Sequence, residues 1–431
     1  MAKKASSAKN KPRAVKRGQS SKVIGSGPRT GWLSSGKLAI LVALVFGGIG
    51  LYFLTTSNAL GPEEVQLADD PARGLLYEGK KVKNKGPCKG GFDITTPEDE
   101  QIDGKEKRRC AHLDPTPEGV DIRERIKKVD ENLAALAAHD EKYKPVKSTD
   151  TDNEQQPLDT AETITGSNMN GVYARDWPCV GTGTDGARVQ LIYVYPAGGT
   201  NRLSSLRPGF SSIAKRMNQV FFASGHESGN GHQLRYATSS GADGCALRIA
   251  AEPIAGSELD NHTYIKFKLR ERGYRGTPQT YTDPSSGATY TTYKDRKYMI
   301  WIDREVAGKC GLGEIRVDDS AAQTNINNHV VSYSYAWKGC WNYAEPHEVM
   351  HMLGGVQPGA PYSTAGYHCR DERDVMCYKD AAGVNMITPC TRAVDFWRFD
   401  CRHDTYYRGN SPSTGYLSNH WNTANSRFIT R

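Results

Sequence analysis

The spacing of apolar side chains predicts an amphipathic helix in the first half of the chain. Apolar residues recur there at steps of four and three residues: Ile122, Ile126, Val129, Leu133 and Leu136. This spacing is typical of a helix with one apolar face. Two heptads are too few for a coiled coil, so we expect this helix to pack on the main domain.

From residue 170 onward, short apolar runs predict strands instead. The predicted strands are 189–195, 234–238, 246–251 and 298–303, and residues 205–223 fit a helix despite Pro208 near its start. The run 298–303 (YMIWID) is apolar enough to lie at the centre of a sheet. A helix between early strands, and a helix with candidate chemistry near the C-terminus, predict an α+β domain around a mixed sheet. The aromatic, Cys-bearing C-terminal part has little periodicity, and we expect irregular structure held by disulfides.

Segments without apolar periodicity mark the boundaries between these parts. The 431 residues allow two or three domains. Residues 57–87 read as a polar stalk, 88–144 as a Cys-closed segment followed by the helix, and 145–169 as a polar linker. Residues 170–431 then form the main domain.

The N-terminal region predicts a membrane anchor. Residues 1–37 hold ten Lys and Arg and no Asp or Glu, and residues 38–54 carry no charge. With Thr55 and Thr56 the apolar segment extends over 38–56, at the short end of what spans a membrane. The basic tail is expected to stay cytoplasmic, which places the rest of the chain outside the cell membrane. A signal sequence cleaved near Ala59, giving a secreted protein, is the alternative.

The basic tail also accounts for the net charge of +8. The other 394 residues hold 46 basic and 48 acidic side chains, a balance of −2. Nucleic-acid binding depends on basic surfaces that contact phosphates, so this nearly neutral part does not predict a nucleic-acid partner.

The ten cysteines are expected to form five disulfides, because the chain is predicted to face an oxidising compartment. We predict pairing between neighbours, although connectivity does not follow from sequence. The predicted pairs are Cys88 with Cys110, Cys179 with Cys245, Cys310 with Cys340, Cys369 with Cys377, and Cys390 with Cys401. The chain has no CxxC motif, which argues against a zinc ribbon or a thioredoxin-type site.

The candidate chemistry lies in the stretch from His347 to Gly354 (HEVMHMLG). Residues four apart share one face of a helix, so His347 and His351 can present two imidazoles to one metal ion. Two neutral imidazoles suit zinc, and a third protein ligand leaves one position open for water. Glu348 stands next to them, where it can accept a proton from that water as the water attacks a carbonyl. Pro346 fits the first helical turn, and Gly354 ends the helix.

The motif HExxHxxG, followed by Met376-Cys377-Tyr378, resembles the metzincin zinc endopeptidases. The wider pattern HExxHxxGxVQxxAPxxxxxxHCxDExDxMCY is similar to secreted or surface zinc metalloproteases found mainly in actinobacteria. The resemblance covers roughly residues 170–431 and, more weakly, the Cys88–Asp114 segment. It implies a metzincin-like catalytic domain with a mixed twisted sheet, an active-site helix and Zn²⁺. It also implies a protein or peptide substrate.

The third zinc ligand is where this chain departs from the metzincin pattern. In that family it stands three residues after the glycine, and here that position holds Gln357, a poor ligand for zinc. We favour His368, which lies 17 residues past His351 on a loop inserted into the usual short turn. Asp371 is the rival, since metzincins sometimes use Asp.

The resemblance also assigns roles around the metal. Met376 would form the floor beneath the zinc ligands, and Tyr378 would donate a hydrogen bond to the oxyanion or lie on the metal at rest. Tyr378 as a buried structural residue is the alternative. In some metzincins a Cys of a preceding segment blocks the zinc. If Cys110 did so here, Cys88 would be left unpaired, and we favour the disulfide.

Other polar residues suggest weaker sites. His226 and His232 lie in a Gly- and Ser-rich loop that is a weak candidate for a second metal, and His403 and His420 are expected to be surface or core residues. Acidic residues cluster near Met376: Asp371, Glu372, Asp374, Asp380, Asp400 and Asp404. Such a cluster can hold Ca²⁺, which takes six to eight oxygen ligands. A solvated acidic surface opposite Arg370 and Arg373 is the interpretation that we favour.

These observations predict a membrane-anchored, extracytoplasmic zinc metalloendopeptidase. His347, His351 and His368 would hold the zinc, Glu348 would be the general base, and Tyr378 would assist. The alternative is a catalytically inactive metzincin-like module for adhesion or cell-wall binding. The intact Glu348 argues against it, because a non-catalytic domain does not need that carboxylate beside a metal.

Overall fold

The computed structural model describes residues 65–66, 81–96, 99, 108–115, 134, 177–239, 245–282, 289–306, 308–364, 366–380, 383–392, 395 and 397–430. The chain separates into two units, residues 1–61 and 62–431, and every described residue lies in the second. The predicted membrane segment 38–56 lies outside the described residues, as does the predicted helix 122–136 apart from Ala134. Within the described part of the chain, no helix combines the length and apolarity that crossing a membrane requires.

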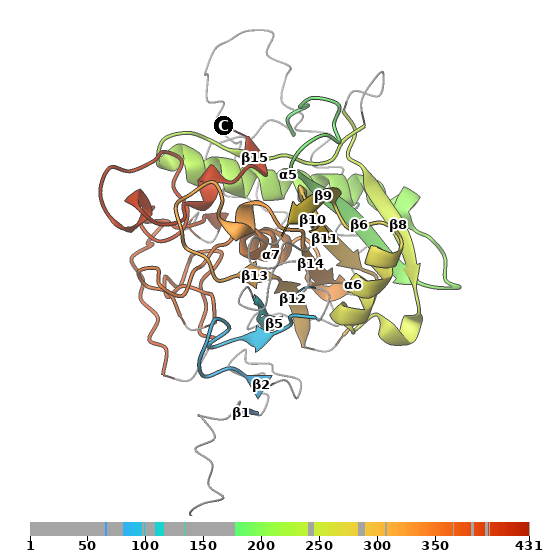
Figure 1. Ribbon diagram of the computed structural model, residues 1–431, viewed down its shortest axis with the longest axis horizontal. Coiled ribbons are helices and arrows are strands. Elements are labelled where there is room, and N and C mark those ends of the chain that lie inside the picture. Colours follow the sequence, from blue (N-terminus) through green and yellow to red (C-terminus); the bar gives the residue numbers. More distant parts are fainter. Residues whose placement is uncertain are drawn as a thin grey trace, which may run out of the picture. The chain divides into compact units, whose positions relative to one another are not determined.

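A six-stranded mixed sheet forms the centre of the fold, in the order β5-β12-β14-β11-β6-β8 (Figure 1). Its strands are β5 Leu113–Pro115, β12 Lys309–Gly313, β14 Ser332–Trp337, β11 Arg296–Ile302, β6 Arg188–Pro196 and β8 Ile249–Ile254. Strands β14, β11, β6 and β8 run parallel, whereas β12 is antiparallel to both β14 and β5. The expected α+β class with a mixed sheet is therefore confirmed, and β11 is central as predicted.

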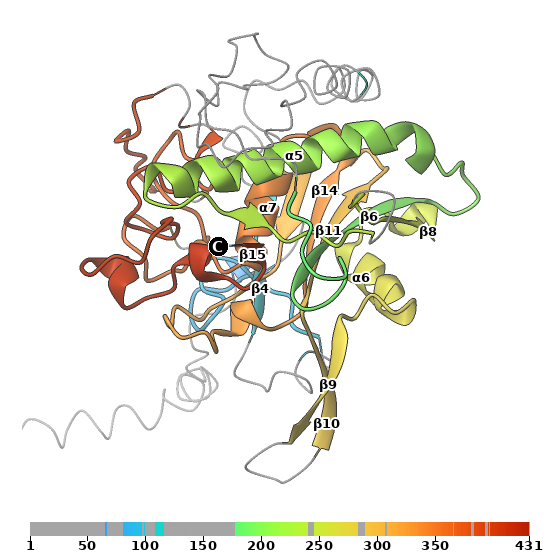
Figure 2. The same cartoon turned by 90° about the horizontal axis from the view of Figure 1, so that it is seen from above.

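Helices cover both faces of this sheet because its strands are apolar on both sides. On β6, Leu191 and Tyr193 pack toward α5 (Leu203–Glu227) and α7 (Glu345–Met352). The alternate residues Ile192 and Val194 pack toward α6 (His262–Glu271). Figure 2 shows the long helix α5 crossing one side of the strands, with α6 on the other. Successive side chains of a strand point to opposite faces, so alternate residues of β6 pack into two separate hydrophobic cores.

Smaller sheets surround the main one. They are β1 Val65–Gln66 with β2 Lys81–Val82, β3 Phe92–Asp93 with β4 Arg109–Ala111 and β13 Ile315–Arg316, β7 Gln233–Leu234 with β15 Ile429–Thr430, and the hairpin of β9 Thr277–Thr282 and β10 Thr289–Lys294. Figure 2 shows this hairpin projecting away from the central strands. Short 3₁₀ turns complete the elements: η2 Gly256–Glu258, η3 Ile326–Asn328, η4 Lys338–Cys340, η6 Tyr416–Ser418 and η7 Thr423–Asn425.

The sequence predictions for individual elements differ in accuracy. The predicted strand 189–195 and helix 205–223 correspond to β6 and α5, and α5 continues four residues farther, to Glu227. The run 246–251 forms a strand that begins later, as β8. The run 234–238 contributes only its first residue to a strand, β7, because Tyr236 and Thr238 pair through isolated bridges. From residue 398 onward the named elements of the described chain are η6, η7 and β15, which agrees with the expected irregular structure.

All five predicted disulfides are present and no described cysteine is free. The bond Cys88–Cys110 closes a loop that contains β3 and ends in β4, and β5 follows directly after it. Because β4 pairs with β13 and β5 pairs with β12, the described part of this Cys-closed segment is built into the sheets of the main domain.

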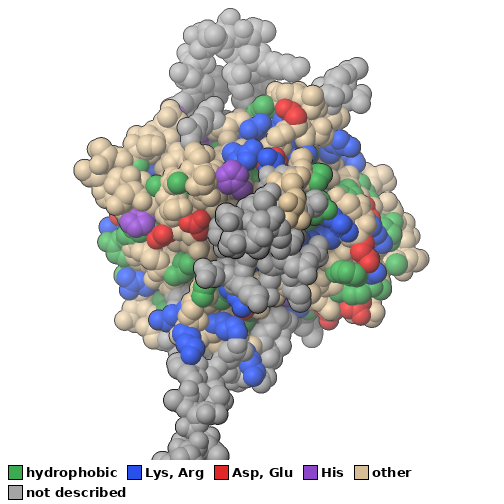
Figure 3. Space-filling model, viewed as in Figure 1, with side chains coloured by type: hydrophobic (Ala, Val, Ile, Leu, Met, Phe, Trp, Pro, Cys, Tyr) green, Lys and Arg blue, Asp and Glu red, His purple; other side chains and the backbone are tan. Residues whose placement is uncertain are grey.

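Charged side chains of both signs are interspersed over the face shown in Figure 3. This mixture is what the nearly balanced charge outside the N-terminal tail leads one to expect.

Candidate metal centre

Helix α7 places two histidines one turn apart on the same face. Its first turn contains Pro346, which needs no hydrogen-bond partner there, and Glu345 stabilises the helix start. The Glu345 carboxylate accepts hydrogen bonds from the backbone N–H of Asn342 and Tyr343 and from the indole of Trp301, at 2.8–2.9 Å. The helix ends at Met352, and Gly354 follows with a φ of +97°, which favours glycine.

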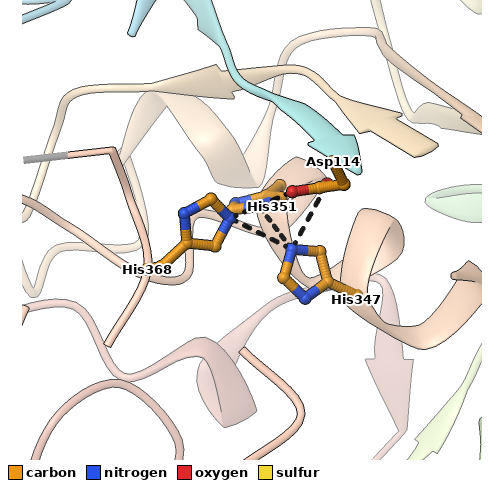
Figure 4. A group of neighbouring side chains, drawn as sticks. All are labelled: Asp114, His347, His351 and His368. Atoms are coloured by element: carbon orange, nitrogen blue, oxygen red, sulfur yellow. Dashed lines mark hydrogen bonds and ion pairs between the residues drawn. The ribbon is translucent and has the colours of Figure 1, made fainter. Parts of the chain in front are cut away.

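The third histidine, His368, returns to the helix from the loop that follows it. Its Nε2 lies 3.2 Å from His347 Nε2, which in turn lies 3.0 Å from His351 Nε2. All three side chains are buried. Figure 4 shows the three rings converging on one point, from α7 and from the loop. The three histidines named from the sequence therefore come together.

The Nδ1 atom of each ring lies against an oxygen. His347 Nδ1 is 2.8 Å from the carbonyl oxygen of Val375, and His351 Nδ1 is 3.0 Å from that of Gly355. His368 Nδ1 is 3.0 Å from the carboxylate of Asp380. An Nδ1 that donates to an oxygen fixes the tautomer in which the Nε2 lone pair is free for a metal. All three rings thus aim their basic nitrogen at the same point.

A fourth group, the carboxylate of Asp114, completes the cluster. It comes from β5, more than 200 residues away in sequence, and faces the imidazoles in Figure 4. Its Oδ2 lies 3.4 Å from His347 Nε2, and its Oδ1 lies 3.3 Å from His368 Nε2. The four side chains form one group with metal-ligand chemistry, each buried.

The spacing of these atoms fits zinc. Ligand atoms at about 2.0–2.1 Å from a tetrahedral zinc are about 3.3 Å from one another. His347 Nε2 lies 3.0–3.4 Å from His351 Nε2, His368 Nε2 and Asp114 Oδ2, and His368 Nε2 lies 3.3 Å from Asp114 Oδ1. All four ligand atoms lie within 4.8 Å of one another. Three imidazoles with a carboxylate are also a donor set that zinc accepts. The residues present therefore suit a tetrahedral zinc ion.

Glu348 lies beside the cluster in a space that β12 leaves open. Its side chain is fully buried, and neither carboxylate oxygen meets an N–H or O–H donor among the described residues. A Cβ atom at Gly311 of β12 would collide with Glu348 Oε1, so this strand position requires glycine. A buried carboxylate without a donor is unfavourable unless a cation or water lies near it.

Burial and neighbouring charges shift the pKa values of the titratable groups in the cluster. Burial lowers the pKa of His347, and burial together with the neighbouring His347 and His368 lowers that of His351 well below its usual range. Burial also opposes the charge of His368, but hydrogen bonds to Asp114 and Asp380 outweigh it and raise its pKa to about 9. Burial, and then the Asp114 charge, raise the pKa of Glu348 well above its usual range. Burial thus favours the neutral form of His347 and His351, whereas Asp114 and Asp380 favour the charged form of His368.

Tyr378 lies beside the third histidine, and Met376 belongs to the hydrophobic core. The ring of Tyr378 is 4.2 Å from that of His368, and its hydroxyl donates a short hydrogen bond to Asp114 Oδ1. Met376 is fully buried and follows Val375, whose carbonyl oxygen contacts Nδ1 of His347. The disulfide Cys369–Cys377 joins the two sides of this loop, as predicted.

The alternative ligands lie elsewhere. Gln357 donates to the carbonyl oxygens of Arg316 and Gly354 and accepts from the N–H of Asp318. Its side-chain amide therefore stabilises the loop by hydrogen bonds to the backbone. Asp371 is not part of the histidine group. Cys110 is bonded to Cys88 and does not block the histidine cluster, in agreement with the disulfide that we favoured.

Among the remaining candidates, His232 faces backbone carbonyls of Thr430 and Gly409 with its two ring nitrogens, and His420 stacks on Tyr416 at 3.9 Å. The favoured solvated acidic surface is wrong for most of its members, because Asp371, Asp374, Asp380 and Asp400 are buried. Asp374 and Asp400 accept hydrogen bonds from nearby backbone N–H groups, and Asp380 contacts Nδ1 of His368.

Sequence reasoning missed Asp114, the role of Asp380 and the requirement for Gly311. Asp114 had no local signal, because nothing in its surroundings resembles a metal motif. Asp380 was grouped with other acidic residues, although its position shortly after Met376 placed it near the loop that carries His368. The glycines of β12 (KCGLG) were a visible signal that a side chain approaches this strand closely.

Comparison with known proteins adds no identification. No family model matches the chain, and no match is found among curated proteins.

Proposed function

We propose that this protein is a zinc-dependent endopeptidase of the metzincin type, anchored in the cell membrane by residues 38–56 with its catalytic domain outside. The observation that carries the proposal is the arrangement of His347, His351 and His368. Each ring has its Nδ1 against an oxygen. His347 Nε2 lies 3.0 Å from His351 Nε2 and 3.2 Å from His368 Nε2, and the buried Glu348 lies beside them.

The side chains of the site have distinct tasks in peptide hydrolysis. A bound zinc ion would lower the pKa of a coordinated water and polarise the peptide carbonyl. Next to a bound cation Glu348 would be ionised despite the burial and the Asp114 charge that raise its pKa, so it can accept the proton of the attacking water and return it to the leaving amine. Tyr378 stays protonated, because burial and then the Asp114 charge raise its pKa well above the usual range, so its hydroxyl can donate to the developing oxyanion. Asp380 and two backbone carbonyls keep the imidazoles oriented.

A non-catalytic metal-binding module is the second candidate. Four protein ligands are typical of structural zinc, and Asp114 supplies a fourth. Glu348 favours the enzyme, because a structural site gains nothing from a buried carboxylate that meets no donor. Gly311, which leaves room for Glu348, favours the enzyme for the same reason.

The test measures zinc content and casein hydrolysis for the full-length chain and for Glu348→Gln. We expect about one zinc per chain in both proteins and a loss of at least about 10² in rate in the variant, the usual contribution of a general base. Equal activity in the two proteins would exclude Glu348 as the base. A chain that binds no zinc would refute the proposal as a whole.

A further inference from the structure

The third histidine needs a support that the other two receive from a helix. His347 and His351 are placed by α7, whereas His368 lies outside the helices and named strands of the described chain. Figure 4 shows its ring reaching the cluster from an irregular stretch of chain. The residue before it, Tyr367, has a φ of +71°, which is unfavourable for a bulky side chain. A strained residue of this kind persists only where its surroundings hold it, so the contacts of Tyr367 matter for the position of His368.

The ring of Tyr367 lies inside the loop that the Cys88–Cys110 disulfide closes. Tyr367 is fully buried and forms an apolar cluster with both cysteines and with Ile315 of β13. Its hydroxyl donates a hydrogen bond of 3.3 Å to the carbonyl oxygen of Pro87, 280 residues earlier in the chain. The neighbour of the third ligand is therefore anchored in a distant segment.

Gly91 leaves the space that this ring fills. A Cβ atom at Gly91 would lie 2.6 Å from a ring carbon of Tyr367 and 2.8 Å from the carbonyl oxygen of Ala111, too close for any side chain. Hydrogen bonds of 3.0 Å fix the backbone at this point, because the N–H of Gly91 donates to Cys88 and its carbonyl oxygen accepts from Lys83. The loop thus presents a fixed slot for one aromatic ring.

The same segment also contacts the ligand itself. Phe92, next to Gly91, stacks on the ring of His112 with the ring centres 6.0 Å apart. The ring of His112 meets that of His368 edge on, at 5.2 Å. Side chains of one segment therefore pack against both the third ligand and the residue that precedes it.

We propose that the loop closed by Cys88–Cys110 sets the position of the third metal ligand, with Tyr367 as the positioning residue. Its ring, held in the slot beside Gly91, fixes the backbone from which His368 reaches the metal. The inference rests on the metal centre of the proposed function, but not on peptide hydrolysis. Zinc sites normally have at least three protein ligands, so this segment is then a working part of the metal centre.

The test measures zinc affinity by chelator competition and the optical spectrum of the cobalt-loaded protein, both on the full-length chain. Tyr367→Leu removes the ring, Tyr367→Phe keeps it, and Gly91→Ala fills the slot without changing Tyr367. The control for the loss of a buried tyrosine is Tyr407→Leu, because Tyr407 is equally buried and also donates to a backbone carbonyl, at 2.8 Å. The control for the added methyl group is Gly256→Ala, where a Cβ atom has room.

We expect Tyr367→Leu and Gly91→Ala to bind zinc about 10–100-fold more weakly than wild type, since a misplaced ligand costs affinity. Their cobalt spectra should also differ from that of wild type. Tyr367→Phe should keep the affinity and spectrum of wild type, because the ring stays in the slot. Both controls should do the same, even where urea unfolding shows a loss of stability. This contrast separates a positioning role from a general structural one.

Hydrogen exchange decides the question if Tyr367→Leu and Gly91→Ala fail to fold. Coupling between two sites is reciprocal, so zinc must stabilise the loop if the loop places a zinc ligand. Zinc should slow amide exchange in residues 88–96, which contain no proposed ligand, by at least about fivefold, the lower end of typical coupling. Exchange in the β9–β10 hairpin should not change. The slowing should persist in the isosteric Asp114→Asn, and its absence there or in wild type would refute the positioning role.

The other outcomes separate this inference from the proposed function. If Tyr367→Leu and Gly91→Ala bind zinc as tightly as wild type, or if Tyr407→Leu weakens binding as much as Tyr367→Leu, the positioning role is refuted. The proposed function stands in that case, provided that wild type hydrolyses peptide in a Glu348-dependent manner. If affinity falls as expected but wild type hydrolyses no peptide, the positioning role stands and the endopeptidase is refuted. A wild type that binds no zinc refutes both.

Discussion

Acid should destabilise the protein through Glu314, the buried carboxylate that joins Arg109 to Lys266. Burial opposes its ionisation, but the charges of Lys266 and Arg109 outweigh burial and lower its pKa from 4.5 to about 2. The pKa is therefore lower in the folded state than in the unfolded state. The resulting stabilisation is complete above about pH 4.5 and is lost as the pH falls toward 2. A shift of about 2.5 pKa units corresponds to about 3 kcal/mol in the free energy of unfolding.

The measurement is urea unfolding of the full-length chain, followed by tryptophan fluorescence with the disulfides intact, at pH 7, 4.5 and 3. Glu314→Gln should be less stable than wild type at pH 7, by about 3–5 kcal/mol, because it leaves the buried cations short of a partner. It should also lose less stability than wild type between pH 4.5 and 3. The control is Glu271→Gln, on the exposed surface of α6 beside Lys268. If Glu314→Gln and wild type lose stability in parallel over this range, the assigned pKa shift is refuted.

Four further predictions concern the site and the topology. His368→Ala should remove most of the zinc, whereas Gln357→Ala should keep it near one per chain; the reverse result by metal analysis would place the third ligand at Gln357. Asp380→Asn should weaken zinc binding by about 10–100-fold in a chelator competition, because it disturbs the orientation of a ligand, and unchanged affinity would contradict that role. Gly311→Ala should retain zinc but reduce the rate of peptide hydrolysis by at least about tenfold, because it displaces the general base; full activity in a peptide assay would show that Glu348 has room elsewhere. A tag at the N-terminus should survive protease added outside intact cells while the 62–431 part is digested, and its loss would reverse the proposed orientation.

The sequence was most informative where the signal is local. His347, Glu348 and His351 follow from helical spacing, and the disulfide Cys369–Cys377 spans only eight positions. His368 could be named because the chain between helix α7 and Met376 was expected to return to the two histidines of the helix, and it does so. Strand β11 was recognised from its uninterrupted apolar run, YMIWID.

What could not be predicted depends on pairing between distant segments. Asp114 reaches the cluster only because β5 joins β12, and no local pattern records which strand becomes its neighbour. Strand β14 (SYSYAW) alternates Ser with Tyr and was not recognised as a strand buried on both faces. The acidic residues near Met376 were interpreted as solvated because carboxylates are seldom buried, whereas hydrogen bonds keep Asp374 and Asp400 inside.

The separation of Arg109 and Glu314 by 205 residues has a consequence for how this protein is made. During synthesis the segment with β4 and β5 emerges first, and β12 and β13 follow only after most of the domain has been translated. Contacts between such distant parts form late in folding, because a long loop must close before they gain anything. The N-terminal segment therefore has to wait unpaired for its partner strands. Each molecule that completes folding then has β5 paired with β12, so the carboxylate of Asp114 reaches the histidines only after this last pairing.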